Sequence, residues 1–140
     1  MIVAWQKLHP DAIVPRKAYA NDAGGDLRVL EDTLVPAGQG VDVRTGVAIN
    51  VPPGWYARIV GRSSALRKRG LLVVEGTIDS GFTGELYSYV YCPGTQDVLL
   101  EKGESVAQLL MLPVPEVTWE LVDELPQTER GVNGFGSTGA

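Results

Sequence analysis

The sequence predicts an all-β domain with one short helix and a flexible C-terminal tail. Clusters of Pro and Gly recur at short intervals, and the segments between them alternate in polarity or form short apolar runs, which is typical of strands. Only one segment carries both start and stop signals of a helix. The composition becomes acidic and then glycine-rich from residue 123, so we place the folded domain at residues 1–122 and the tail at residues 123–140.

The composition limits the classes of function. A chain of 140 residues, 44% hydrophobic and 21% charged, fits one folded domain rather than a disordered or membrane protein. A net charge of -5 argues against nucleic acid as a partner, because binding to a phosphate backbone needs a basic surface. Cys92 has no second cysteine to pair with and only His9 as a second soft ligand, so any metal is bound through oxygen. We find no leader or membrane segment and expect a cytoplasmic protein.

Strands are expected where apolar or alternating segments are bounded by turn residues. The clearest alternation runs from Val41 to Val51, with every second residue on one side. The adjacent Gly24 and Gly25 predict a bend that delivers Asp26 to one face of a sheet. Residues 33–40 are expected to form a turn. The predicted strands cover residues 2–8, 41–51, 55–60, 71–74, 86–92, 98–100, 105–114 and 119–122.

The helix is predicted at residues 61–70, with a serine as its N-cap, basic residues in its last turn and Gly70 as its stop. Arg62, Ser63 and Ser64 stand together where this helix begins. A guanidinium and two hydroxyl groups favour an anion, particularly a phosphate. The alternative is a capped surface helix with a solvated basic face, and this segment alone leaves both interpretations open.

Residues 76–85 predict the tip of a hairpin between the apolar runs 71–74 and 86–92. Glycines there permit the close approach of a flat ligand to the backbone, and the segment places Asp79 and Phe82 beside it. By itself, an Asp-Ser-Gly turn more often has an aspartate that only satisfies neighbouring amides.

Two further features suggest ligand contacts. Gln108 is the one polar residue within an apolar strand, so its amide needs a partner in the protein or in a ligand. The segment 130–139 combines Arg130 and Phe135 with glycines and hydroxyls, which suits a flap closing over a base and its phosphates. A glycine-rich disordered end is the alternative for that segment.

Five segments taken in order resemble the homotrimeric deoxyuridine triphosphatases (dUTPases). Each motif is weak alone, but together they extend over nearly the whole chain. They are residues 23–27 (Ala-Gly-Gly-Asp-Leu), 61–64 (Gly-Arg-Ser-Ser), 76–85, 103–109 and 130–139.

The resemblance implies a compact β-barrel or jelly-roll-like subunit and a homotrimer with active sites at subunit interfaces. It also implies Mg²⁺-dependent hydrolysis of dUTP to dUMP and pyrophosphate. Such an activity limits uracil incorporation into DNA and supplies dUMP for thymidylate synthesis. The chain departs from the family where Phe82 replaces a usual Tyr, where Glu104 and Ser105 replace Asp and Arg, and at Val74 and Glu75.

The motif positions imply a role for each residue. Asp79 is expected to activate the attacking water and Asp26 to support the sugar and catalytic-water side of the pocket. The hairpin backbone is expected to select uracil, with Phe82 against the sugar and Phe135 stacked on the base. Mg²⁺ is expected to be held mainly by the phosphates and water, with no certain protein ligand. The expected phosphate contacts are Arg62, Ser63, Ser64, Gln108, Arg130, Ser137 and Thr138, and the expected base and sugar contacts include Gly76, Thr77 and Ile78.

Two alternative functions remain open from the sequence. A dCTP deaminase shares the resemblance to the serine and Ile-Asp segments, but that family requires a catalytic Glu where this chain has Tyr89. The second alternative is a nucleotide-gated protein-interaction module, in which the ordered tail signals occupancy to a protein partner.

Overall fold

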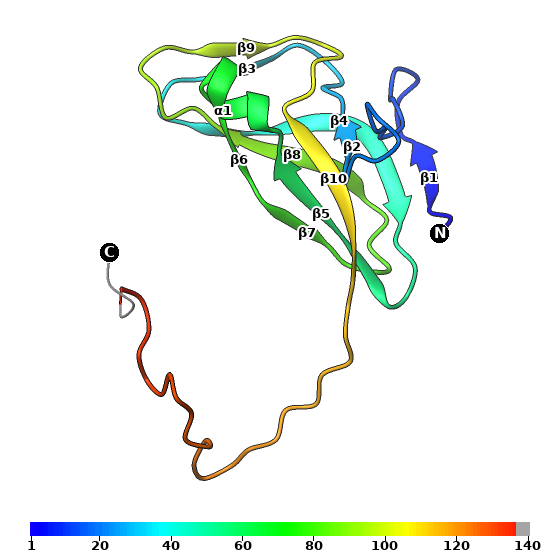
Figure 1. Cartoon of the computed structure of the whole chain (residues 1–140). Helices are drawn as coiled ribbons and strands as arrows, with labels where there is room; N and C mark the ends of the chain where they lie inside the picture. The colour runs from blue at the N-terminus through cyan, green and yellow to red at the C-terminus, as the bar shows by residue number, and fades with distance from the viewer. Residues whose placement is uncertain (137–140) are drawn as a thin grey trace.

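Two four-stranded antiparallel sheets form the body of the protein (Figure 1). The structure is a computed structural model and describes residues 1–136. The first sheet has the order β1-β4-β8-β6, the second has the order β2-β10-β5-β7, and β3 pairs with β9 in a small ribbon. The strands are β1 (Ala4–Lys7), β2 (Gly25–Leu27), β3 (Thr33–Val35), β4 (Gly40–Asn50), β5 (Trp55–Gly61), β6 (Leu72–Val74), β7 (Gly76–Ile78), β8 (Glu85–Tyr91), β9 (Val98–Leu100) and β10 (Ala107–Pro113). The all-β prediction is confirmed.

The core lies between the two sheets and continues under the small ribbon. The alternation predicted from Val41 to Val51 is confirmed only in the first half of β4, where Val43 is buried and Asp42 exposed, because residues 45–49 are all buried. Gly46 interrupts this strand with a φ of 68°, and the register with β8 shifts between Arg44 and Ala48. A β-bulge of this kind bends the strand and re-aims its neighbouring side chains.

The helix α1 (Ser63–Arg69) follows β5 directly. The prediction of a serine N-cap is wrong: Arg62 occupies that position in extended conformation, and no side chain caps the helix. The predicted stop is confirmed, because Gly70 has a left-handed φ of 64° and its N–H bonds back to the helix.

The predicted hairpin is confirmed at its base, away from the tip, where β6 pairs with β8. Between them the chain crosses to the other sheet, where β7 pairs with β5. The loop 79–84 then returns the chain from β7 to β8. The two arms of the hairpin therefore separate toward the tip and belong to different sheets.

Two other predictions are wrong. Residues 33–35 form β3 instead of a turn, because β9 supplies a partner that local sequence does not reveal. Residues 119–122 form no strand: β10 ends at Pro113, and no strand or helix follows up to residue 136. Trp119 is 91% exposed and Leu121 99% exposed, and this segment extends away from the body (Figure 1).

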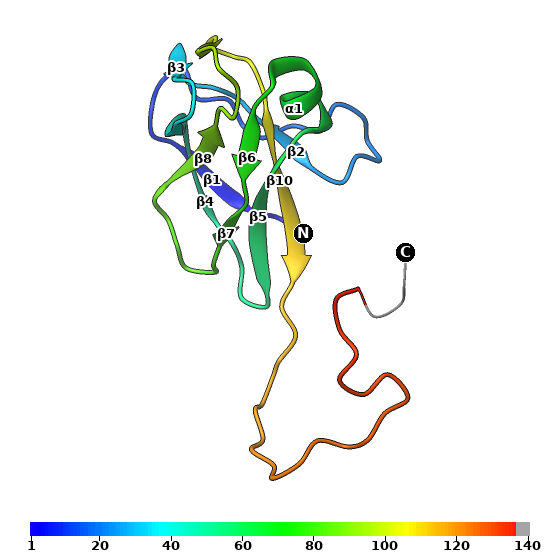
Figure 2. The same ribbon diagram turned by 90° about the vertical axis from the view of Figure 1, so that its left-hand side faces the viewer.

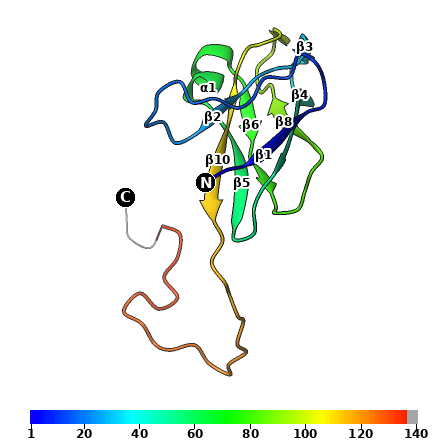
Figure 3. The same cartoon turned by 90° about the vertical axis from the view of Figure 1, so that its right-hand side faces the viewer.

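The two ends of the body carry different elements. In Figures 2 and 3, α1 and β3 lie at one end, while the turn from β4 to β5 lies at the other. The loop 79–84 accompanies that turn, and the Ser80 hydroxyl donates to the Val51 carbonyl oxygen at 2.9 Å. Across residues 1–136, no helix has the length and hydrophobicity needed to cross a membrane.

Candidate active site

A polar cavity of about 200 Å³ opens at the end of the body that carries α1. The segment before β2, the start of α1 and the strand β10 converge on it, so residues distant in sequence share one space. It includes three of the seven residues that the sequence predicted to bind phosphates, namely Arg62, Ser63 and Gln108. The lining residues are Ala18, Asp22, Ala23, Gly24, Asp26, Arg62, Ser63 and Gln108.

Asp26 is the buried anion of this cavity, with 8% of the residue exposed. Its Oδ1 lies 3.2 Å from Nε of Arg62, and its Oδ2 lies 3.6 Å from Nη2 of Arg28. Arg62 also donates from Nη1 to the Ser105 carbonyl oxygen at 3.3 Å. Asp22 also lines the cavity, so the charges of Arg28, Arg62, Asp22 and Asp26 balance, and the Arg62 guanidinium is the group that suits an anionic ligand.

Sequence reasoning missed Arg28. Its sequence position could have indicated it, because Arg28 stands two residues after Asp26 and a strand places such residues on the same face.

Gln108 stands opposite Asp26 in the pairing of β10 with β2. Its Nε2 donates to the Gly61 carbonyl oxygen at 3.4 Å, so part of its amide has a partner within the protein. Gly24 packs directly against this side chain: a Cβ on Gly24 would lie 2.5 Å from Oε1 of Gln108. The glycine is therefore required by close packing, in addition to the predicted bend.

The two serines lie in the first turn of α1. Ser63 is exposed and lines the cavity, whereas Ser64 is half-buried. Because neither side chain caps the helix, neither hydroxyl is committed to the helix end.

The loop 79–84 presents the other predicted catalytic group. Asp79 is exposed, and its carboxylate takes part in none of the ion pairs within residues 1–136. Phe82 is 47% exposed, and its ring lies against Gly84, where a Cβ would be 2.7 Å from Cζ of the ring. The loop therefore exposes an uncommitted carboxylate and a partly supported aromatic ring side by side.

The strand β7 contributes Gly76, Thr77 and Ile78. It pairs with β5 along one edge, and the described residues supply no strand for the opposite edge. Unpaired strand edges expose backbone donors and acceptors, as recognition of a nucleobase requires. The atypical Glu75 pairs with Arg58 of β5 and so tethers the start of β7.

The chain does not bring its two groups of predicted site residues together. Ile78 pairs with Ala57 near the start of β5, whereas Arg62 follows the end of that strand. Because Ile78 is opposite Ala57, Asp79 is level with Tyr56, and the six residues of strand from there to Arg62 span roughly 20 Å along β5. The start of α1, which lines the cavity, and the loop 79–84 therefore lie at opposite ends of the second sheet (Figures 1 and 3).

The tail residues lie apart from both groups (Figure 2). Arg130 donates from Nε to the Asn133 carbonyl oxygen at 2.9 Å, and Phe135 is fully exposed. Ser137 and Thr138, two of the predicted phosphate contacts, lie outside the described residues.

A larger cavity of about 390 Å³ lies between β1 and the second sheet. Its lining is mainly apolar, including Val3, Trp5 and Met111. It lacks the converging polar groups that a phosphorylated ligand needs, so the smaller cavity is the better candidate site.

Comparisons with known proteins agree with the motifs. The family model described as dUTPase matches residues 10–139. The deoxyuridine 5'-triphosphate nucleotidohydrolase of Clostridioides difficile is 38% identical over 136 residues, covering 96% of this chain and 95% of the relative. The protein of the same name from Paramecium bursaria Chlorella virus 1 is 40% identical over 134 residues, covering 96% and 95%.

One solved structure has a similar fold over nearly the whole length of the chain. A mutant of the Staphylococcus bacteriophage 80alpha dUTPase with dUpNHpp has a TM-score of 0.91 and 25% identity, covering 99% of both chains. The jelly-roll-like β fold implied by the motifs is therefore confirmed. Because a family model and relatives match nearly its whole length, the chain belongs to the dUTPase family.

Proposed function

We propose that this protein hydrolyses dUTP at the α-phosphorus and releases dUMP and pyrophosphate. The observation that carries the proposal is the placement of Asp79, an exposed carboxylate without an ion-pair partner among residues 1–136, directly after the open edge of β7. A base bound along that edge would bring its sugar and first phosphate toward this carboxylate. Membership in the dUTPase family supplies the substrate class.

Asp79 serves as the general base in this proposal. An ionised carboxylate accepts a proton from a water within hydrogen-bond reach. The water then attacks the α-phosphorus in line with the leaving pyrophosphate. Asp26 supports the reaction from the cavity by holding the Arg62 guanidinium in place, 3.2 Å away.

The backbone of Gly76, Thr77 and Ile78 reads the base. Uracil presents two acceptors flanking a donor, and cytosine places a donor where uracil has one acceptor. A mispaired base would leave buried polar groups unsatisfied, at a cost of about 1 to 3 kcal/mol each. Phe82 packs under the deoxyribose and excludes a ribose 2′-hydroxyl by steric contact.

The cavity binds the phosphates. Arg62 supplies charge, Ser63 and Ser64 supply hydroxyl donors, and Gln108 supplies its amide. Arg130, Ser137 and Thr138 close over the terminal phosphate when the tail folds down, and Phe135 stacks on uracil. These tail contacts follow from the resemblance of residues 130–139 to the fifth motif.

The protein is proposed to form a homotrimer with shared sites, and the separation of the two groups supports a site shared between copies. One copy supplies the loop 79–84, a second supplies the cavity, and the tail is free to reach a third. The outer face of the first sheet offers a surface for this contact, since its large side chains are 36% to 49% exposed. They are Leu72, Val74, Tyr87, Tyr89 and Tyr91, adjacent on β6 and β8.

Mg²⁺ is proposed to enter with the substrate. Within residues 1–136, no three His, Cys, Asp or Glu side chains are grouped to hold a metal ion. Both Asp26 oxygens face guanidinium groups, so phosphate oxygens and water suit the ion better than this carboxylate. When bound, Mg²⁺ neutralises negative charge on the phosphates.

Pyrophosphate release should be measured with dUTP, dCTP, dTTP and UTP, each with and without Mg²⁺. We expect turnover of dUTP alone, and only with the metal. Equal rates with dCTP or UTP would contradict the proposed base and sugar selection. Ammonia release from dCTP would instead establish the deaminase alternative.

A further inference from the structure

The loop 79–84 is anchored at two points that the reaction itself does not use. On the outgoing side, the Ser80 hydroxyl donates to the Val51 carbonyl oxygen at 2.9 Å. On the return side, Glu85 pairs with Arg44 of β4. Arg44 lies within β4 and Val51 follows it directly, so both contacts attach the loop to the first sheet.

The Ser80 anchor acts beside Asp79. Val51 is 1% exposed and follows β4, so its carbonyl oxygen is held by the core. The Asp79 carbonyl oxygen accepts from the Phe82 amide at 3.2 Å, which closes the turn immediately after the carboxylate. Fixing Ser80 therefore limits the positions that the adjacent Asp79 can take.

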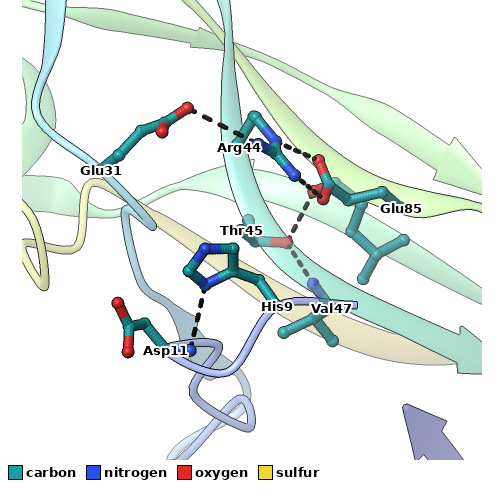
Figure 4. Close-up of polar contacts among 8 residues, drawn as sticks. His9, Asp11, Glu31, Arg44, Thr45, Val47 and Glu85 are labelled. Carbon is teal, nitrogen blue, oxygen red and sulfur yellow. Dashed lines mark hydrogen bonds and ion pairs between the residues drawn. The ribbon is translucent and has the colours of Figure 1, made fainter. Parts of the chain in front are cut away.

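The Glu85 anchor acts at the other end of the loop (Figure 4). Arg44 donates from Nε to Oε2 at 3.1 Å and from Nη2 to Oε1 at 3.0 Å. The Glu85 side chain is only 8% exposed, whereas that of Arg44 is 42% exposed, so this two-point bond is shielded from water on the carboxylate side. Phe82 packs against Gly84, the residue before Glu85.

The β-bulge supports the Glu85 anchor. Thr45 donates its hydroxyl to the Leu86 carbonyl oxygen at 2.6 Å and accepts from the Val47 amide at 3.2 Å (Figure 4). The bulge thus ties the first two residues of β8 to β4 through side chains, where the regular ladder is interrupted.

We propose that Ser80 and Glu85 are positioning residues with separate tasks: Ser80 orients the Asp79 carboxylate, and Glu85 sets the Phe82 ring. This inference rests on the proposed dUTP hydrolysis. Asp79 acts in the chemical step, whereas Phe82 contacts bound substrate and transition state alike. Loss of the first anchor should therefore lower kcat, and loss of the second should raise KM.

The experiment measures kcat, KM and the dissociation constant of a non-hydrolysable dUTP analogue for the full chain. Ser80→Ala is expected to lower kcat by about 10- to 100-fold with KM nearly unchanged, because small misplacements of a catalytic group have effects of this size. Ser80→Thr, which keeps a hydroxyl, should recover most of the rate. Thr83→Ala is the matched control, since Thr83 lies in the same loop without a hydrogen bond of its side chain to residues 1–136.

Glu85→Gln is expected to raise both KM and the analogue's dissociation constant by about tenfold, with kcat nearly unchanged. Arg44→Lys provides a second variant if Glu85→Gln fails to fold, because lysine keeps the charge but loses the two-point geometry. Arg44→Lys should likewise raise KM.

The outcomes separate the inference from the proposed function. Absence of dUTP turnover in the unmodified chain overturns both. Turnover in the unmodified chain, together with variants that lower only the melting temperature, overturns the positioning roles and leaves the function intact. A fall in kcat for both variants would contradict the division of tasks.

Discussion

Asp26 and Arg62 form an ion pair at the wall of the polar cavity, with Oδ1 and Nε 3.2 Å apart. The same guanidinium reaches the Ser105 carbonyl oxygen with Nη1, so two of its nitrogens are held by the protein. The planar group is thereby fixed before any ligand arrives. An anion in the cavity would meet a donor that needs no reorientation.

Arg62→Lys should lower kcat/KM for dUTP by about 10- to 100-fold, because a lysine cannot hold Asp26 and Ser105 and also present a planar donor to phosphate. The measurement is steady-state hydrolysis. Arg67→Lys is the control, since Arg67 is an exposed residue of the same helix. Equal effects of the two substitutions would contradict a specific role for Arg62.

The pKa of Glu85 lies below its ordinary value of 4.5, first because Arg44 donates hydrogen bonds to it and also through a hydrogen bond from Tyr87. Burial acts in the opposite direction. A carboxyl whose pKa is lower in the folded state stabilises that state above its unfolded pKa, and this stabilisation is lost as pH falls through the folded pKa.

The free energy of unfolding should therefore fall more steeply in the unmodified protein than in Glu85→Gln when the pH is lowered below about 4.5. Denaturant unfolding at several pH values measures both slopes. Glu31→Gln is the control: Glu31 lies 3.8 Å from Arg44 with its side chain 59% exposed, and removing it should leave the slope unchanged. If the free energy of unfolding falls equally with pH in the unmodified protein and in Glu85→Gln, Glu85 is not a source of the loss of stability at low pH.

The strands were largely predictable because their signals are local. Alternation located β4, and turn residues bounded β5 and β9. The β3 strand was not predictable in this way, since its pairing with β9 is a long-range contact. Residues 119–122 carry a strand-like pattern, but within residues 1–136 no sheet edge pairs with them.

The sequence indicated which residues form the site but not how the fold arranges them in space. Motif positions indicated Asp26, Arg62 and Gln108, which the fold brings to one cavity. The pairing of β7 with β5 separates Asp79 from that cavity, and no local pattern reveals this. Arg28 was missed because its role depends on which strand face becomes buried.

Gly24→Ala should weaken substrate binding and lower stability by about 1 kcal/mol, because the new Cβ displaces Gln108 and breaks its bond to the Gly61 carbonyl oxygen. The measurements are KM for dUTP and denaturant unfolding. Gly38→Ala is a poor control, because Gly38 has a φ of 71° and an alanine there would be strained by the backbone alone. Gly94→Ala is better, since Gly94 lies outside the cavity, has no positive φ, and a Cβ there would meet only Cys92 Sγ at 4.0 Å. A normal KM for Gly24→Ala would show that Gln108 has no part in binding.

Asp79→Asn should abolish pyrophosphate release while keeping the affinity for dUTP, because the amide keeps the size of the side chain but accepts no proton. Hydrolysis and equilibrium binding should be measured on the same preparation. Asp97→Asn is the control, as Asp97 is an exposed aspartate in a different turn. Full activity of Asp79→Asn would remove the general base from the proposed mechanism.

Mixing two inactive variants examines whether the site is shared between copies. Asp79→Asn damages the loop 79–84, and Arg62→Gln damages the cavity roughly 20 Å away along β5. If each site takes its loop from one copy and its cavity from another, some sites in a mixed assembly receive both intact parts. Random assembly of equal amounts should restore about a quarter of the normal activity, since each part is intact in half of the copies.

Coexpression of the two variants with different affinity tags allows mixed assemblies to be isolated and assayed. The separately purified variants, combined without exchange of subunits, provide the baseline. A mixed assembly that stays inactive while each homo-assembly is correctly folded would place the whole site within one copy. In that case the loop and the cavity would have to approach each other by a rearrangement of β5 and β7, which their backbone pairing opposes.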